Sequence, residues 1–225
     1  DFNQNKYNCK ISRLIKKSKN SKAKKFDIVI MAAGKNSRLN INYPKTLIKL
    51  KYPNKKNTII ENLINILETS KININKINIV VRKEYEKKFL NIKKNISKVQ
   101  IIPLNENQIT GTARCLINVK QHIKSEDFIL IWGDIALISK RIIYIIASLH
   151  SKYNSLMSFA TCIKKNPYLS IHRNTDGVIL KVKHNKKKIS KSFLSEQDTS
   201  FFMCKKKIFK HLINFEMKFS KKKEC

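Results

Sequence analysis

From residue 26 onward, short apolar runs alternate with stretches whose apolar residues recur at helical spacing. Apolar runs of about 4–8 residues that end in turn residues are typical of buried strands. The first part of the chain therefore predicts strands at residues 27–31, 77–81, 99–102 and 128–132.

Helices are predicted between and after these strands. In the first of them, Ile59, Leu63 and Leu67 fall on one face, and Thr58 stands where a helix cap belongs. Strands that alternate with helices form parallel βαβ units, so the pattern predicts an α/β fold, Rossmann-like, with helices on both faces of a mostly parallel sheet. The predicted helices cover residues 58–68, 84–92, 112–123 and 141–149.

The remainder of the chain is richer in strands. Apolar runs predict strands at 156–162, 178–183 and 200–204, followed by a helix at 205–213. We expect these strands to form a small antiparallel extension of a mixed sheet. Residues 1–25 are polar and basic and are interpreted as a linker or arm, which leaves 26–225 as the folded domain.

Three loops follow predicted strands, at the edge where open α/β sheets bind ligands. The first contains Met31, followed by Ala32, Ala33 and Gly34. The small size of the last three residues lets a ligand approach the backbone. The cations Arg38 and Lys45 follow in the same loop and suit a polyphosphate. The other two loops are QITGT, at residues 108–112, and the Gly-Asp pair directly after the strand that ends in Trp132.

The residues of these loops and their order along the chain resemble those of the sugar-phosphate nucleotidyltransferases, also called nucleotide-sugar pyrophosphorylases. The matching segments read MAAGKNSRL and PKTL in the first loop, QITGT in the second and WGDIALI in the third. They are most similar to the uridyltransferase domain of the bifunctional enzyme that makes UDP-N-acetylglucosamine. The resemblance covers about residues 26–214 and implies the GT-A-like nucleotidyltransferase fold.

The resemblance also implies a role for each loop. Backbone N–H groups from Met31 to Gly34 would hold the nucleotide with Gly133, and Gln108, Gly111 and Thr112 would contact the base. Two residues would be catalytic: Arg38 on the leaving β- and γ-phosphates and Lys45 on the α-phosphate in the transition state. Asp134 would hold Mg²⁺, a hard cation that suits a carboxylate and bridges phosphate oxygens.

Several positions depart from the family pattern. Asn36 replaces the second loop glycine, QITGT has one residue more than the uridyltransferase spacing, and Lys183 stands where those enzymes place a Glu. Asp198 falls near a family Asn that binds sugar and is carried over as an acceptor contact. The family's second metal ligand lies well beyond the Gly-Asp motif, and the chain does not start with Met. Three explanations stay open for the ligand: the chain is truncated at its C-terminus, the second ligand is a different residue, or metal binding is weak. The absent Met indicates a trimmed chain or a piece of a longer protein.

The formal net charge of +33 would by itself indicate a nucleic acid or an acidic membrane as partner. Only six of the 48 basic residues are arginine, however, and aromatic residues are not interleaved with the lysines. We expect the charge to attract nucleotides and sugar phosphates instead of nucleic acid. No apolar run approaches the ~18 residues that a membrane span needs, so none is expected.

The five cysteines are odd in number and show no CxxC spacing, which argues against a disulfide framework or a zinc site. Cysteine usage of this kind favours a reducing, cytoplasmic setting. Cys115, Cys162 and Cys204 stand among apolar residues and are expected in the core. The five histidines form no spaced pair with a carboxylate or a cysteine, which favours structural or exposed roles.

The sequence thus predicts a Mg²⁺-dependent enzyme that joins a nucleoside triphosphate to a sugar 1-phosphate, releases pyrophosphate and serves nucleotide-sugar synthesis for the cell envelope. Two alternatives stay open. One is a cytidylyltransferase for phosphocholine, an alditol phosphate or a phosphonate, and the other is a non-catalytic relative that binds nucleotide to regulate an assembly. The base, the acceptor and the oligomeric state do not follow from the sequence.

Overall fold

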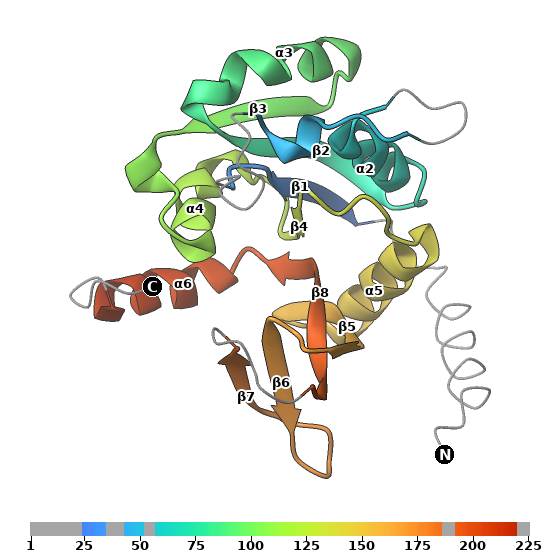
Figure 1. Ribbon diagram of the computed structural model, residues 1–225, viewed down its shortest axis with the longest axis vertical. Coiled ribbons are helices and arrows are strands. Elements are labelled where there is room, and N and C mark those ends of the chain that lie inside the picture. The colour runs from blue at the N-terminus through green and yellow to red at the C-terminus, as the bar shows by residue number, and fades with distance from the viewer. Residues whose placement is uncertain (1–23, 35–42, 52–56, 186–191, 220–225) are drawn as a thin grey trace.

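A mixed, eight-stranded sheet with helices on both faces forms the body of the molecule (Figure 1). The computed structural model describes residues 24–34, 43–51, 57–185 and 192–219. The strand order is β3-β2-β1-β4-β8-β6-β7, with β5 paired to β8 off this path. This arrangement confirms the predicted fold class.

The parallel half of the sheet places the first strand in the middle. β1 (Lys25–Met31) pairs in parallel with β2 (Asn73–Arg82) and β4 (Asp127–Trp132), and β2 pairs in parallel with β3 (Val99–Leu104). Helices cover both faces of this half, so a strand inside it is apolar at successive positions. Ile28, Val29 and Ile30 accordingly have no exposed surface.

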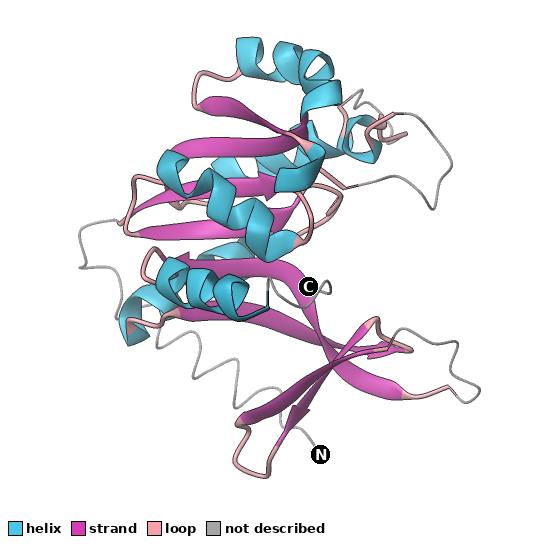
Figure 2. Ribbon diagram, turned by 90° about the vertical axis from the view of Figure 1, so that its left-hand side faces the viewer, coloured by secondary structure: helices cyan, strands magenta, loops and turns pink. Residues whose placement is uncertain are grey.

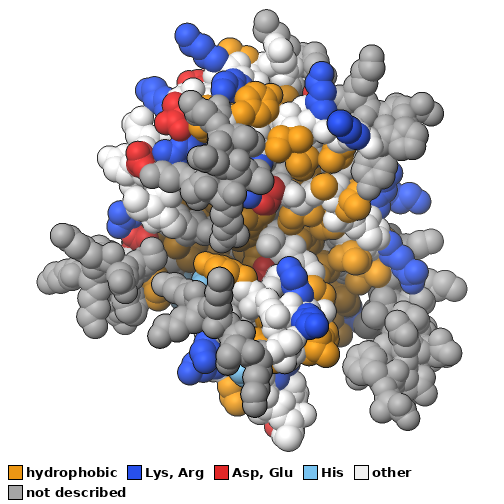
Figure 3. Space-filling view, viewed as in Figure 1, with side chains coloured by type: hydrophobic (Ala, Val, Ile, Leu, Met, Phe, Trp, Pro, Cys, Tyr) orange, Lys and Arg blue, Asp and Glu red, His pale blue; other side chains and the backbone are white. Residues whose placement is uncertain are grey.

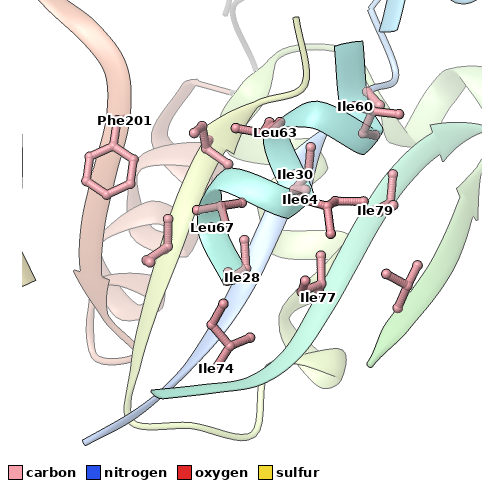
Figure 4. Close-up of a cluster of buried hydrophobic side chains, with 14 of the residues drawn as sticks. Ile28, Ile30, Ile60, Leu63, Ile64, Leu67, Ile74, Ile77, Ile79 and Phe201 are labelled. Atoms are coloured by element: carbon pink, nitrogen blue, oxygen red, sulfur yellow. The ribbon is translucent and has the colours of Figure 1, made fainter. Parts of the chain in front are cut away.

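The helices divide between the two faces of the sheet. Figure 4 shows the first core, in which α2 (Ile59–Glu68) packs on β1 and β2, and the same cluster includes residues of α3 (Glu86–Asn95) and α5 (Lys140–Tyr153). The second core, on the other face, is formed with α4 (Thr112–Val119) and α6 (Ile208–Phe219). Within the described ranges, four short 3₁₀ helices connect these elements: Lys45–Leu47, Lys83–Tyr85, Glu106–Gln108 and Lys120–His122.

The start of α2 is fixed by its own side chains. The Thr58 hydroxyl accepts a hydrogen bond from the Glu61 backbone N–H at 3.3 Å, and Glu61 Oε2 accepts one from the Thr58 N–H at 2.8 Å. This reciprocal capping box satisfies two backbone N–H donors that an uncapped helix end would leave without a partner. The predicted cap at Thr58 is therefore confirmed.

The antiparallel half is built on one long strand. β8 (Leu194–Lys205) pairs with β4 at one end and with β5 (Met157–Lys165) along most of its length. β6 (Leu169–Arg173) pairs with both β8 and β7 (Ile179–His184). In Figure 2 the strands of this half run from the main sheet into a lower, strongly twisted group.

Some boundaries and one burial prediction differ from the sequence-based expectations. The strand β6 was not predicted, and the helix expected at 205–213 begins only at Ile208, because β8 continues to Lys205. The predicted helix at 112–123 becomes α4 followed by a 3₁₀ turn. Cys115 and Cys204 are buried as expected, but the expectation for Cys162 is wrong: it lies in the last four residues of β5, whose side chains are all exposed.

Charge is spread over the surface. On the face shown in Figure 3, the Lys and Arg side chains of the described residues lie scattered around the outline of the molecule, and no single patch collects them. Within the described part of the chain, every helix is too short or too polar to cross a membrane.

Candidate active site

The backbone that follows β1 forms the floor of the site. The N–H of Ala32 donates to the Val80 carbonyl at 2.8 Å and the N–H of Gly133 donates to the Met31 carbonyl at 2.8 Å, so both neighbouring strands hold this turn. A Cβ built on Gly34 would meet no atom of the described residues within 4 Å. A ligand can therefore approach the Ala32–Gly34 backbone closely.

The second element is the short 3₁₀ helix Lys45–Leu47. Pro44 precedes it in an extended conformation, as the fixed φ of proline favours. Leu47 and Thr46 are buried and anchor the turn, while Lys45 stays half-exposed at the edge of the site. The Thr46 hydroxyl is buried and has no hydrogen-bond partner among the described residues.

The third element follows β4. A Cβ added to Gly133 would lie 3.1 Å from Thr46 Cγ2 and 3.2 Å from the Met31 carbonyl oxygen, so a side chain here would press on both neighbours. The loop is held farther on by Asn62, whose side-chain amide donates to the Ala136 carbonyl at 2.8 Å. Asp134 is thereby directed to the same side as the 3₁₀ helix.

These two elements meet in an ion pair. Lys45 Nζ lies 2.5 Å from Asp134 Oδ2, and the two side chains remain 38% and 36% exposed. The pair places a cation and an anion at the carboxyl ends of β1 and β4, where parallel sheets bind ligands.

The fourth element is the loop between β3 and α4, which we call the base loop (residues 108–112). Gly111 adopts φ 93°, a left-handed conformation that side chains disfavour, and its carbonyl accepts from the Cys115 N–H at 3.1 Å. The Gln108 side chain accepts from the Asn105 N–H at 2.9 Å, which closes the preceding 3₁₀ turn. Gly111 thus starts α4 and presents the loop backbone to the cavity.

Together these elements enclose a cavity of about 200 Å³. One side of its lining is small or polar and the other is apolar, an arrangement suited to a ligand with a phosphate chain and a planar base. Burial raises the pKa of the Cys115 thiol to about 11, so this group stays neutral. The lining residues are Met31, Ala32, Ala33, Gly34, Lys45, Thr46, Ile109, Gly111, Thr112, Cys115, Trp132 and Asp134.

Most of the predicted site residues come together in this cavity, but three described ones do not. Gln108 closes the turn before the base loop, and Gly133 packs beneath the cavity floor. Asp198 does not line the cavity, and its Oδ1 accepts from the Ser200 N–H on β8 at 2.8 Å. Arg38 lies outside the described residues. The roles predicted for all the site residues, inside the cavity or not, stay predictions.

Four lining residues were not predicted from the sequence. Thr46, Ile109 and Trp132 each stand inside a matched motif, beside residues that were singled out. Cys115 lies three residues after Thr112, one helical turn along the face of α4 that begins at the cavity. Neighbouring positions in the motifs and helical spacing were therefore the signals available.

The donor set fits a magnesium ion that arrives with a triphosphate. Among the described residues, no group of three or more His, Cys, Asp or Glu side chains is placed to hold a metal. Mg²⁺ is commonly bound by one or two carboxylates plus substrate phosphates, keeping several waters. Asp134 offers one such carboxylate at the cavity edge.

Comparison with protein families gives a match to the "Nucleotidyl transferase" model over residues 27–168, more than half of the chain. The chain belongs to the nucleotidyl transferase family. The matched range includes every residue that lines the cavity. It ends before β8 and α6, which complete the sheet and its second core.

Curated relatives of this nucleotidyl transferase are bifunctional proteins. It is 32% identical over 179 residues to "Bifunctional protein GlmU" of Buchnera aphidicola subsp. Schizaphis graminum, covering 79% of this chain and 34% of that protein. It is 30% identical over 181 residues to the protein of the same name from Thermosipho melanesiensis, covering 79% and 37%. The chain thus spans about a third of the length of these relatives.

Solved structures share the fold of this nucleotidyl transferase at low identity. HddC from Yersinia pseudotuberculosis matches with a TM-score of 0.61 and 17% identity, covering 83% of this chain and 79% of that one. UDP-glucose pyrophosphorylase complexed with UDP-glucose gives 0.61 and 16%, with coverage of 84% and 79%. CMP:2-keto-3-deoxy-manno-octonic acid synthetase complexed with CTP gives 0.62 and 10%, with coverage of 86% and 78%.

Proposed function

We propose that this nucleotidyl transferase joins a nucleoside triphosphate to a sugar 1-phosphate and releases pyrophosphate, giving a nucleotide sugar. The observation that carries the proposal is the cavity itself. It brings the exposed backbone of Ala32–Gly34 together with Lys45, Asp134 and the Gly111–Thr112 wall at one edge of the sheet. The UDP-glucose pyrophosphorylase among the structural relatives supports the nucleotide-sugar class.

The proposed reaction needs charge stabilisation more than covalent chemistry. A phosphate oxygen of the acceptor attacks the α-phosphorus, and the bond to the bridging oxygen of the leaving pyrophosphate breaks. Lys45 supplies a cation to the α-phosphate as its charge grows, and the N–H groups of Ala33 and Gly34 bind the phosphate chain, since the Ala32 N–H already donates to the Val80 carbonyl. Arg38 is proposed to bind the leaving phosphates, and Gly111 and Thr112 to contact the base.

Mg²⁺ is proposed as the cofactor, held by Asp134 and the phosphate oxygens of the substrate. When bound, the ion neutralises phosphate charge and helps to orient the triphosphate. Asp134 would hold the ion with its carboxylate, and Lys45, its ion-pair partner in the structure, would offer its ammonium to the phosphate. The two charged residues of the cavity thus receive complementary parts of one metal–nucleotide complex.

The test is pyrophosphate release by the full chain with Mg²⁺. Each common nucleoside triphosphate is combined with a panel of sugar 1-phosphates, and Lys45→Gln serves as the inactive control. We expect release with at least one pair and its loss in the control. No release with any pair would overturn the proposal, and triphosphate binding without release would favour the non-catalytic relative.

A second candidate is a cytidylyltransferase, favoured by the length of the base loop. The loop has one residue more than the uridyltransferase spacing, and Ile109, Gly111 and Thr112 of this loop line the cavity where the base is proposed to bind. A CTP complex is among the structural relatives. Thermal-shift measurements with UTP and CTP separate the two candidates, because the preferred triphosphate raises the Tm at lower concentration.

A further inference from the structure

The base loop is held from behind by side chains of α4. Arg114 Nη1 donates to the Thr110 hydroxyl at 3.1 Å, and the Asn118 side-chain amide donates to the Gln108 carbonyl at 3.0 Å. These contacts join the start and the middle of the loop to a single helix. Arg114 itself does not line the cavity, so it holds the loop from outside the cavity wall.

The same arginine also binds the last helix. Arg114 Nε and Nη2 both donate to Glu216 Oε2 of α6, at 3.1 and 3.0 Å. A guanidinium has a planar set of fixed donors and can serve two partners on different sides at once, which an ammonium group on a flexible chain does less well. Arg114 therefore connects the base loop to α6 across 102 residues of sequence.

α6 is itself firmly attached to the sheet. Phe209, in its first turn, is 1% exposed and stacks on Phe128 of β4 with a centroid distance of 5.7 Å. Glu216 lies seven residues farther, and positions seven apart share a helix face. The carboxylate that receives Arg114 is thus presented by a helix whose other end is fixed in the second core.

The residue that Arg114 contacts lies in the middle of the base loop. Thr110 has an exposed side chain and stands between Ile109 and Gly111, which both line the cavity. An exposed loop has conformations to lose on binding a ligand. A side chain that holds it in the free protein reduces this cost before the nucleotide arrives.

We propose that Arg114 is a positioning residue for nucleotide recognition: it ties the base loop to α6 and so fixes Gly111 and Thr112 in the cavity wall. The proposal rests on the proposed function, because it assigns the base of the triphosphate to this wall. It adds that α6, which lies beyond the family match at 27–168, contributes to nucleotide affinity without contacting the nucleotide.

The experiment compares wild type with Arg114→Gln, Arg114→Lys and Glu216→Gln in the full chain. Arg173→Gln is the matched control, because it breaks another arginine–glutamate pair, with Glu196 at 2.7 Å on the strand extension. Hydrogen exchange of the amides at 108–112 reports on the loop in the free protein. Trp132, the single tryptophan and a cavity residue, reports triphosphate binding by its fluorescence and needs no turnover.

We expect Arg114→Gln and Glu216→Gln to speed exchange in the base loop and to raise the triphosphate Kd and KM about three- to tenfold, with kcat within about twofold. Arg114→Lys should restore only part of the affinity, and Arg173→Gln should change neither readout. The Tm should fall by less than about 3 °C, as for other half-exposed ion pairs.

Two results would overturn the inference. Unchanged exchange in Arg114→Gln would show that the arginine does not hold the loop. Faster exchange with an unchanged Kd would show that the held loop does not serve nucleotide binding. A wild-type chain that binds no triphosphate would instead overturn the proposed function, and the exchange rates would still decide whether Arg114 fixes the loop.

Discussion

Lys45 Nζ lies 2.5 Å from Asp134 Oδ2, although 89 residues of sequence separate the two side chains. Both are more than a third exposed, so water screens their attraction and the pair contributes little to stability. A screened pair is easy to separate, which suits two residues that are proposed to take different ligands. Mutations at either position should therefore act on activity far more than on folding.

Replacing Lys45 with Gln should lower kcat by about 10²–10³-fold, the usual cost of removing one group that stabilises charge in a transition state. The Tm should stay within about 2 °C of wild type, because the side chain is half-exposed. Pyrophosphate release and thermal unfolding measure the two effects. Lys49→Gln, at an exposed position nearby, is the control, and equal losses in both variants would contradict a specific role for Lys45.

Replacing Asp134 with Asn should raise the Mg²⁺ concentration for half-maximal activity by about tenfold or more, because a neutral amide binds the ion less well than a carboxylate. Titration of activity with Mg²⁺ at saturating triphosphate measures the shift. The double variant with Lys45→Gln should lose less than the sum of the single losses, since the two residues act on one complex. An unchanged Mg²⁺ requirement would remove Asp134 from the metal site.

Substitution by alanine should affect stability at one glycine of the site and substrate binding at another. At Gly133 the new Cβ would press on Thr46 Cγ2 and the Met31 carbonyl, which should cost about 1–3 kcal/mol of unfolding free energy. At Gly34 it would meet no atom of the described residues within 4 Å, so stability should change by less than about 0.5 kcal/mol while the triphosphate KM rises. Urea unfolding and steady-state kinetics distinguish the two, and a destabilised Gly34→Ala would count against open space there.

Stability should fall in mild acid because of His150. Burial lowers its pKa, the lysines at 24 and 205 lower it further, and Asp127, whose Oδ1 lies 3.6 Å away, opposes them. The unfolded chain binds a proton near the ordinary value of about 6.5, whereas the folded protein does so only at lower pH. Unfolding free energy is thus fully retained above about pH 6.5 and declines below it, by at most about 1.4 kcal/mol per pH unit for this group.

Urea unfolding from pH 8 to pH 5 checks this pH dependence. His150→Gln should be less stable at pH 8, since Ser158 loses its contact with the ring nitrogen at 2.9 Å, but should show a shallower decline. His122 has a pKa lowered first by burial and then by two lysines, and it adds a decline of the same sign. The exposed His172 is the control position, and an identical slope in His150→Gln would assign the decline elsewhere.

The sequence predicted the parallel half well because its signals are local. Apolar runs buried on both faces and the Thr58 cap need no knowledge of distant residues. The strand β6 was missed because only two of its five residues, Ser170 and Ile171, are buried, so it carries no clear apolar run. Cys162 was misplaced because apolar neighbours in the sequence do not show which part of an antiparallel strand is covered by other elements.

The candidate site was predictable as a set of motifs but not as a set of contacts. Each matched loop ends a strand, and parallel strands bring their carboxyl ends together. The part played by Gln108 could not be read in the same way: its side chain closes a 3₁₀ turn with Asn105, which is a local contact hidden within a functional motif. The hydrogen bonds from Arg114 to Glu216 depend on the packing of α6, and no local sequence pattern predicts them.

The continuity of β8 restricts how the two halves of the molecule can move. Its residues 201–205 pair with β4, where Phe201 lies opposite Ile131, and its residues 194–198 pair with β5 and β6. The ladder between β8 and β5 is irregular between these two parts, and Ser200 there adopts a left-handed φ of 58°. A change of angle between the halves is therefore confined to this irregular point, because ladder hydrogen bonds hold the strand on either side of it.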